Sequence, residues 1–235
     1  NLARLQRVSA DTSLWFSLNA QRSFDILRQG GIGILPMDVG YSILGGSGES
    51  LRKIFNTKRR ASSKLNAMVA NHDIATSVYR LSARGRDVIE CITCEYDLPL
   101  GAVAPCNMDH PMLTCLDTET LNASTKSETL VMLLNAGKFH DALTQLSWEY
   151  KFPLFGSSAN LSMTGTKFDG DDIEPEIKAI ADIFIHYGLM KYHPWKQSST
   201  LLNVETFEVV RFGSCYENIS DILKRHFKVN LPEKN

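Results

Sequence analysis

The sequence GGIGILPMDVGY occupies residues 30–41. Its segment 31–35 is a short apolar run that ends at Pro36, and a run of this kind between turn-forming residues predicts a buried β-strand. Gly30 and Gly31 come directly before the run, and glycines in this position end helices. The stretch therefore predicts the end of a helix followed at once by a buried strand.

The segments on both sides of this stretch continue the alternation of helices and strands. Before it, Ala20, Phe24 and Leu27 give residues 20–28 the apolar face of a helix. Further strands are expected at residues 41–44, 67–70, 100–104, 130–134, 153–155, 183–186, 200–203 and 207–211, and further helices at residues 51–56, 74–80, 83–91, 139–150, 177–181 and 219–227. The last two strands resemble a hairpin. This order favours a single α/β domain with a twisted, mixed sheet flanked by helices.

A division of the chain into three segments follows from the same pattern. We expect an N-terminal extension at residues 1–18, the α/β domain at residues 19–215, and a C-terminal helix and tail at residues 216–235. Residues 107–128 contain many Thr, Asn and Asp residues and little periodicity. This segment is the best candidate for a mobile loop or an insertion.

The composition limits the classes of function. The 235 residues are 43% hydrophobic and 22% charged, with a net charge of −1. A near-neutral chain has no bulk attraction to nucleic acid or to an anionic membrane, so an anion site must come from a local cluster of charge. No apolar run approaches the roughly 18 residues that a membrane span needs, and we expect a cytoplasmic protein with no membrane partner.

The five cysteines do not form a disulfide framework, because their number is odd and their spacing loose. Cys91 and Cys94 form a C-x-x-C pair, with Cys106, His110 and Cys115 downstream. The second set is poorly spaced for zinc. Burial of Cys91 on a helix and a metal or redox site both remain open, and a reducing compartment is the default.

The segment from Arg52 to Lys64 contains six cations and no acidic residue. The cations are Arg52, Lys53, Lys58, Arg59, Arg60 and Lys64. Ser62 and Ser63 lie among the last four of them, and hydroxyls beside fixed cations suit a polyphosphate. A solvent-facing basic turn is the alternative.

Two further segments carry hydroxyl groups beside predicted strands. Residues 156–160, GSSAN, follow the strand predicted at 153–155. Ligands of α/β sheets bind at strand ends, and small residues let a ligand approach the backbone, although Gly, Ser and Asn are also common in turns. The cluster Ser198, Ser199 and Thr200 opens a later strand and means little alone.

Together, and in this order, the segments resemble the YrdC-like family, whose best-known members are threonylcarbamoyl-adenylate synthases. Residues 30–41 resemble the family's apolar strand running into P-T-D-T-x-Y, and residues 55–64, FNTKRRASSK, resemble its K-x-R-P-x-x-K-P loop. Residues 158–162, SANLS, resemble S-A-N-x-S. Residues 199–203, STLLN, resemble S-T-V-V-D, and residues 210–213, VRFG, resemble L-R-x-G. The resemblance covers about residues 20–215 and implies the YrdC-like fold, with a concave basic pocket.

The resemblance also implies a reaction and roles for residues. In the family, ATP, bicarbonate and threonine give threonylcarbamoyl-adenylate and pyrophosphate for tRNA modification, and Mg²⁺ accompanies the triphosphate. The residues carried over are Lys58, Arg60 and Lys64 as phosphate ligands, the first two in the catalytic role; Ser158, Asn160, Ser199 and Arg211 around the nucleotide and adenylate; and Met37, Asp38, Val39 and Tyr41 in the substrate pocket. RNA or tRNA-modification partners are implied as well.

The departures from the family pattern fall mainly on the amino-acid side of the implied site. Met37 and Val39 replace two threonines, residues 97–101 lack a third, and residues 133–135 lack an arginine. Ala61 and Leu65 replace two prolines. A site loses discrimination when its polar groups are replaced by apolar ones. We therefore expect either another amino-acid or acyl substrate or loss of synthase activity, unless the chain is a divergent orthologue in which other residues substitute.

A non-catalytic module that binds a nucleotide or RNA is the alternative function. It would use the same basic concavity. The near-neutral net charge argues against strong affinity for RNA, because contacts to phosphate dominate such binding.

Overall fold

The computed structural model describes residues 2–59 and 65–234, with residues 2–12 described by their backbone alone. Its centre is a mixed sheet of ten strands in the order β10-β9-β4-β6-β3-β7-β2-β1-β8, with β5 paired to β6. The strands are β1 Ile32–Leu35, β2 Ser42–Gly45, β3 Ala67–Val69, β4 Leu100–Pro105, β5 Thr125–Lys126, β6 Thr129–Leu134, β7 Phe155–Ser158, β8 Ile183–Phe184, β9 Leu201–Asn203 and β10 Val209–Arg211. The expected α/β domain with a mixed sheet is confirmed.

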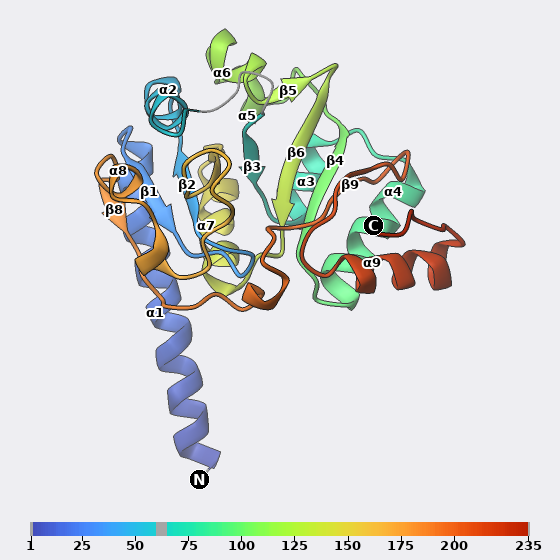
Figure 1. The fold of residues 1–235 in the computed structure, drawn as a ribbon, viewed down its shortest axis with the longest axis horizontal. Helices are drawn as coiled ribbons and strands as arrows, with labels where there is room; N and C mark the ends of the chain where they lie inside the picture. The colour runs from blue at the N-terminus through green and yellow to red at the C-terminus, as the bar shows by residue number, and fades with distance from the viewer. Residues whose placement is uncertain (1, 60–64, 235) are drawn as a thin grey trace.

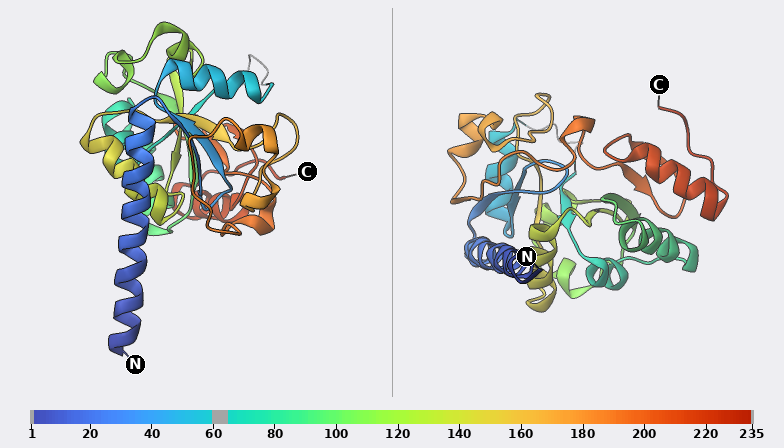
Figure 2. Two further views of the ribbon diagram at one scale, coloured as in Figure 1. Left: turned by 90° about the vertical axis from the view of Figure 1, so that its left-hand side faces the viewer. Right: turned by 90° about the horizontal axis from the view of Figure 1, so that it is seen from below.

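Helices cover one face of the sheet. The helices are α1 Leu2–Arg28, α2 Gly48–Thr57, α3 His72–Val78, α4 Ala83–Glu90, α5 Pro111–Thr114, α6 Thr118–Asn122, α7 Lys138–Glu149, α8 Pro175–Lys178 and α9 Tyr216–Ile222; the short η elements are η1 Cys91–Glu95, η2 Gly170–Asp172, η3 His193–Trp195 and η4 Leu223–Phe227. Figures 1 and 2 show α1, α3, α4 and α7 on the same side of the sheet. The opposite side carries loops of the C-terminal half and keeps a part of the sheet uncovered.

The hydrophobic core lies between this helical layer and the sheet. Ile34 of β1, Met68 of β3 and Met132 of β6 are fully buried there, together with Phe24 and Leu27 of α1. Since side chains alternate between the two faces of a strand, the neighbours of these residues along β3 and β6 point toward the uncovered face. One face of the sheet thus packs into the core, and part of the other face is left uncovered.

The first helix is longer than the sequence predicts. The expected helix at residues 20–28 is the C-terminal third of α1, which begins at Leu2, so the expected boundary at residue 18 falls inside this helix. Ala20 and Phe24 are fully buried, whereas Leu14, Trp15 and Leu18 are each about 60% exposed. The apolar periodicity predicted only the part of the helix that packs against the core. The outer part of α1 projects from the body of the molecule (Figure 1).

Two other predictions need correction. Residues 107–128, expected to form a mobile loop or insertion, contain α5, α6 and β5. Side chains stabilise these helices: His110 accepts a hydrogen bond from Met112 N–H, and Asp117 accepts one from Thr120 N–H. The strand expected at residues 153–155 is β7 at Phe155–Ser158, so Gly156 and Ser158 belong to a central strand and not to a turn.

Candidate functional site

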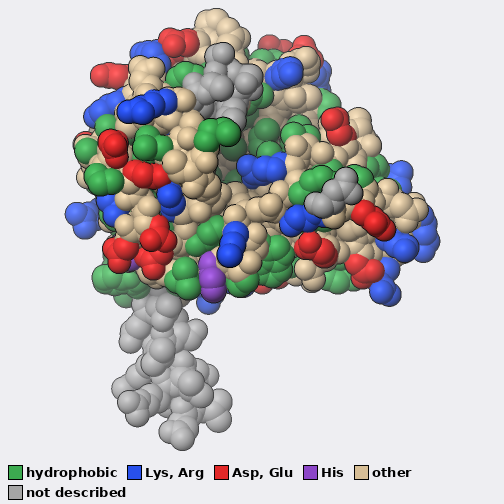
Figure 3. Space-filling view, viewed as in Figure 1, with side chains coloured by type: hydrophobic (Ala, Val, Ile, Leu, Met, Phe, Trp, Pro, Cys, Tyr) green, Lys and Arg blue, Asp and Glu red, His purple; other side chains and the backbone are tan. Residues whose placement is uncertain are grey.

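The uncovered face of the sheet contains a cavity of about 590 Å³, which we call the sheet cavity. Residues of β2, β3, β4, β5, β6, β7, β9 and β10 line it, together with the segments just before β3 and β9. Figure 3 shows a hollow on this side of the molecule. The cavity is therefore built on strands that are far apart in the sequence.

Small residues give the sheet cavity its depth. A Cβ atom at Gly156 would meet Ile43 O at 2.0 Å, and one at Gly101 would lie 2.1 Å from Leu201 Cδ2 and 3.1 Å from Ser199 Oγ. Gly156 pairs with Leu44 of β2 on one side and with Ala67 of β3 on the other. Glycine at these two positions lets neighbouring strands approach and leaves room above them.

The two cations in the described lining of this cavity are Arg211 and Lys126, and the described lining includes no carboxylate. The Arg211 guanidinium donates to Ser199 O, at 2.7 Å from Nη2 and 3.2 Å from Nε. Its Nη2 also lies 3.5 Å from Ser199 Oγ. These contacts hold a planar, permanently charged group beside the hydroxyls of Ser198 and Ser199, an arrangement that suits phosphate oxygens.

Lys58 and Asn160 lie behind the wall of the sheet cavity and not in its lining. Lys58 is only 2% exposed, and its Nζ donates to Ser158 O and to Asn160 O, the latter at 2.5 Å. Ser162 N–H donates to Lys58 O at 3.0 Å. Ser158 does line the cavity, and its hydroxyl donates to Asn160 Oδ1 at 2.5 Å. Lys58 thus fixes the segment that presents Ser158, across about a hundred residues of sequence.

The remaining predicted phosphate ligands, Arg60 and Lys64, lie outside the described residues. Leu65 follows them and lines the sheet cavity. The structure therefore brings three of the predicted site residues, Ser158, Ser199 and Arg211, into one cavity with Lys58 and Asn160 behind Ser158. Their proposed roles remain predictions.

The four residues predicted for a substrate pocket lie elsewhere. Met37, Val39 and Tyr41 are buried in the core, at 1% exposure or less. The Tyr41 hydroxyl donates to Gly188 O at 2.9 Å and accepts from Tyr187 N–H at 3.0 Å, and burial raises its pKa. Asp38 points into a second cavity. None of the four is among the residues that line the sheet cavity.

Sequence reasoning missed several residues of the sheet cavity. Ser42 lies opposite Ser158 in the register of β2 and β7, and Lys126 comes from the segment that was expected to be irregular. Leu133, where the family pattern has an arginine two residues before its proline, does line the cavity. Only strand pairing, which the chain does not reveal locally, identifies Ser42 and Lys126.

The cysteines form no metal cluster within the described chain. Cys91, Cys106 and Cys215 are buried, and Cys94 and Cys115 are exposed. Burial raises the pKa of Cys91 to about 11, which keeps the sulfur as an unreactive thiol. In the described ranges, the side chains close enough to hold a metal ion are Asp169, Asp171 and His186. The structure favours the interpretation of Cys91 as a buried structural residue.

No described helix combines the length and the apolar character that crossing a membrane requires. This finding includes α1, in which the charged residues with described side chains are Arg22, Asp25 and Arg28.

Comparison with known proteins gives a family and a set of similar folds. A family model named Sua5_yciO_yrdC and described as "Telomere recombination" matches residues 25–213. The hypothetical protein smu.1377c from Streptococcus mutans UA159 has a TM-score of 0.71 at 16% identity, covering 91% of this chain and 95% of that one. E. coli YciO has a TM-score of 0.65 at 16% identity, covering 85% and 92%.

P. abyssi Sua5, solved in complex with L-threonine, is similar over 92% of this chain, with a TM-score of 0.71 and 15% identity. This chain spans 59% of the Sua5 chain. At these identities the likeness shows a shared fold. No curated protein matches the chain.

Proposed function

Because the chain belongs to the Sua5/YciO/YrdC family, whose model matches residues 25–213, we propose that it is an adenylate-forming enzyme of the threonylcarbamoyl-adenylate synthase type. Its substrates are ATP, bicarbonate and an amino acid or another small substrate. The observation that carries the proposal is the sheet cavity, in which Arg211, Lys126 and a group of serine hydroxyls face a space of about 590 Å³ whose described lining has no carboxylate. Such a space suits a polyanion.

The reaction needs positioning and neutralisation of charge. The amino acid and bicarbonate form a carbamate and water. A carbamate oxygen then bonds to the α-phosphorus of ATP while the bond from that phosphorus to the bridging oxygen breaks, and pyrophosphate leaves. In this proposal Arg211, whose guanidinium donates to Ser199 O, neutralises the charge that develops on the phosphate oxygens. Ser158 and Ser199 offer hydroxyl donors to the nucleotide or the intermediate.

Magnesium would accompany the triphosphate. The residues described around the sheet cavity fit a metal carried by the nucleotide, because they offer hydroxyls and no carboxylate to bind the ion directly. Bound in this way, Mg²⁺ supplies neutralisation of phosphate charge. Arg211 and Lys126 add to that neutralisation from the protein.

The second substrate is the less constrained part of the proposal. Threonine is one candidate, since Sua5 of the same fold was solved with L-threonine. Leu133 and Leu201 give the floor of this chain's cavity an apolar character. We therefore extend the candidates to other amino acids and to acyl substrates. If the substrate is threonine, we propose that the product serves tRNA modification.

Pyrophosphate release tests the proposal. Full-length protein is incubated with ATP, Mg²⁺, bicarbonate and each amino acid in turn, and pyrophosphate is measured with an omission control for bicarbonate. The variant Arg211→Met should lower kcat/KM about a hundredfold, the cost of losing one donor to a developing charge. Arg225→Met is the matched control, because Arg225 is exposed and pairs with Asp221 away from the cavity.

A non-catalytic module that binds a nucleotide or RNA is the second candidate. The observation that favours it is the position of Lys58, whose Nζ donates to two backbone carbonyl groups of the 158–160 segment. Under this alternative, ATP stabilises the protein, by about 2.7 kcal/mol at a hundredfold excess over Kd, and no amino acid elicits pyrophosphate. Absence of both stabilisation and turnover would contradict a nucleotide site of either kind.

A further inference from the structure

A second cavity, which we call the loop cavity, has a volume of about 580 Å³ and shares no lining residue with the sheet cavity. Five segments build it: α1 near Phe16, the segment after β1, Asp97 before β4, the turn before α7 with the start of that helix, and the loop at residues 187–192. The family resemblance implies no separate ligand for this cavity. Its chemistry can therefore be derived from its own residues.

Asp38 ties three of these segments together through its backbone. Its N–H donates to Ala136 O at 2.7 Å, and its carbonyl oxygen accepts from Tyr192 N–H at 2.9 Å. Gly137, with φ of +102°, lies against the Asp38 carboxylate, so closely that a Cβ atom there would be 2.4 Å from Oδ1. The Asp38 carboxylate is thus held between the turn before α7 and the loop at residues 187–192, next to Gly137, which has no side chain.

Lys191 and Asp38 form a long ion pair at the end of the loop cavity where the turn and the loop meet. Lys191 Nζ lies 3.8 Å from Asp38 Oδ2, and the two side chains are 55% and 31% exposed. This distance is too long for a hydrogen bond. Across the described ranges, the Asp38 carboxylate accepts no hydrogen bond, and burial raises its pKa in spite of Lys191. A partly desolvated carboxylate with unused acceptor capacity faces the cavity.

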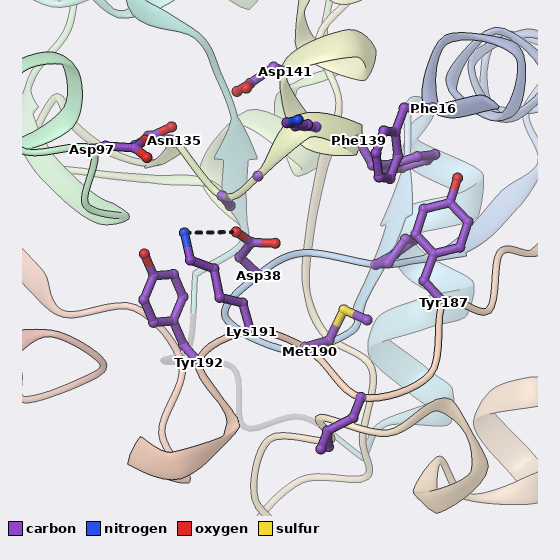
Figure 4. A pocket seen from close by; sticks show the side chains of 15 residues that line it. Phe16, Asp38, Asp97, Asn135, Phe139, Asp141, Tyr187, Met190, Lys191 and Tyr192 are labelled. Carbon is purple, nitrogen blue, oxygen red and sulfur yellow. Dashed lines mark hydrogen bonds and ion pairs between the residues drawn. The ribbon is translucent and has the colours of Figure 1, made fainter. Parts of the chain in front are cut away.

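Aromatic rings form the other end. Phe16 and Phe139 each meet the ring of Tyr187 edge-on, with centroids 5.4 Å and 5.9 Å away. Figure 4 shows these three rings grouped on one side of the cavity, with Asp38 and Lys191 facing each other on the other side. Such rings offer a rigid apolar surface to a side chain of similar character.

The balance of charge narrows the class of ligand. Three carboxylates and two lysines line the loop cavity: Asp38, Asp97, Asp141, Lys138 and Lys191. Neither sign dominates, in contrast to a site for a polyanion or a metal ion. A ligand that carries both charges on neighbouring atoms would satisfy the Asp38 carboxylate and the Lys191 ammonium at once.

We propose that the loop cavity binds a free α-amino acid with a large apolar side chain. Its ammonium group pairs with Asp38, its carboxylate pairs with Lys191, and its side chain lies against Phe16, Phe139 and Tyr187. The proposal does not depend on the reaction in the sheet cavity, because the two cavities have separate linings.

Three probes that share the same benzyl group test this proposal on the full chain by isothermal titration calorimetry without ATP. They are L-phenylalanine, 2-phenylethylamine, which lacks the carboxylate, and 3-phenylpropionate, which lacks the ammonium group. Since each charged hydrogen bond contributes strongly, L-phenylalanine should bind about tenfold or more tightly than either analogue. Equal binding of L-phenylalanine and either analogue, or no binding of L-phenylalanine, overturns the proposal.

Two variants separate the charges. Asp38→Asn should weaken L-phenylalanine and 2-phenylethylamine about tenfold and spare 3-phenylpropionate; Lys191→Met should weaken L-phenylalanine and 3-phenylpropionate and spare the amine. The Lys191 side chain is about half exposed, and among the described residues its backbone forms no turn or loop hydrogen bond, so its variant decides the matter if Asp38→Asn does not fold. Asp109→Asn, an exposed carboxylate outside the cavity, should change nothing. Loss of L-phenylalanine binding in Arg211→Met would place the ligand in the sheet cavity and overturn the proposal.

Discussion

The two cavities have nearly the same volume, about 590 and 580 Å³, and differ in almost everything else. Strands form most of the sheet cavity, whereas loops, a turn and two helices form the loop cavity. The described lining of the sheet cavity has two cations and no carboxylate, and the loop cavity has charges of both signs. Volume therefore does not distinguish the two candidate sites. The sign of the charged side chains that line each cavity does distinguish them.

The two cavities also differ in how the backbone supports them. Asp97, Asn135 and Gly137 line the loop cavity with φ values of +51°, +49° and +102°. Asn135 Nδ2 stabilises this turn by donating to Asp97 Oδ1 at 2.9 Å and to Thr93 O at 3.0 Å. No described residue lining the sheet cavity has a positive φ. The loop cavity depends on turn chemistry, and the sheet cavity depends on close strand pairing.

The largest expected effect on the free energy of unfolding comes from a substitution in the strands that form the sheet cavity. Gly156→Ala should lower the free energy of unfolding by about 4 kcal/mol, because the new Cβ meets the backbone oxygen of Ile43 and neither strand can move aside. Gly137→Ala should cost only about 1–3 kcal/mol, since its strained φ remains but its Cβ meets a side chain. Urea unfolding of both variants measures the difference. Equal losses would contradict the distinction between strand and turn support.

A smaller effect is expected at the support behind Ser158. Lys58→Met removes the donor to Ser158 O and Asn160 O and should lower the free energy of unfolding by about 2–3 kcal/mol. Lys53→Met, on the exposed side of α2, is the matched control and should stay within about 0.5 kcal/mol of the parent. Thermal and urea unfolding check both. A stable Lys58→Met protein would show that the segment holds its shape without this lysine.

Reversing one charge in each cavity sharpens the comparison. Lys126→Glu should weaken ATP binding about tenfold, because it places a carboxylate among groups proposed to face phosphate. Lys138→Glu makes the same change in the loop cavity and should leave ATP binding as it is. Calorimetric titration with ATP measures both. An equal loss in the two variants would mean that ATP responds to the overall charge and not to the sheet cavity.

The smallest expected effect concerns pH. Burial raises the pKa of Asp38 above its value in the unfolded chain, so the folded state binds this proton more tightly. The stabilising contribution is then complete below the unfolded pKa and is lost as the pH rises through the folded pKa. Asp38→Asn should therefore unfold at slightly higher urea concentration than the parent at pH 7, and this gain should vanish below about pH 4. A loss of stability at pH 7 would reverse the assigned sign.

The sequence predicts the elements of this fold well where one physical cause dominates. The apolar run at residues 31–35 is β1 within one residue, because burial on both sides requires continuous apolar side chains. The hairpin of β9 and β10 and the helix at residues 83–91 appear close to their expected positions. In these segments local pattern and final environment agree.

The sequence fails where tertiary pairing decides. Gly156, Ser157 and Ser158 have the composition of a turn, yet they form a central strand, because only small residues fit between β2 and β3. For the same reason Ser42 was not recognised as a neighbour of Ser158. Around Asp38 the pattern predicted one pocket. The chain instead turns at residues 37–40, where Gly40 N–H donates to Met37 O, and this turn sends Met37 and Val39 into the core and Asp38 into the loop cavity.

The position of β7 has a consequence for synthesis of the chain. β7 lies between β2 and β3, although it follows both by more than 85 residues. Until residues 155–158 have left the ribosome, the facing edges of β2 and β3 have no partner strand. Unpaired strand edges can recruit other chains, so this order of synthesis exposes the nascent protein to aggregation, and the pairing of β7 with both neighbours has to close long stretches of chain, which slows folding.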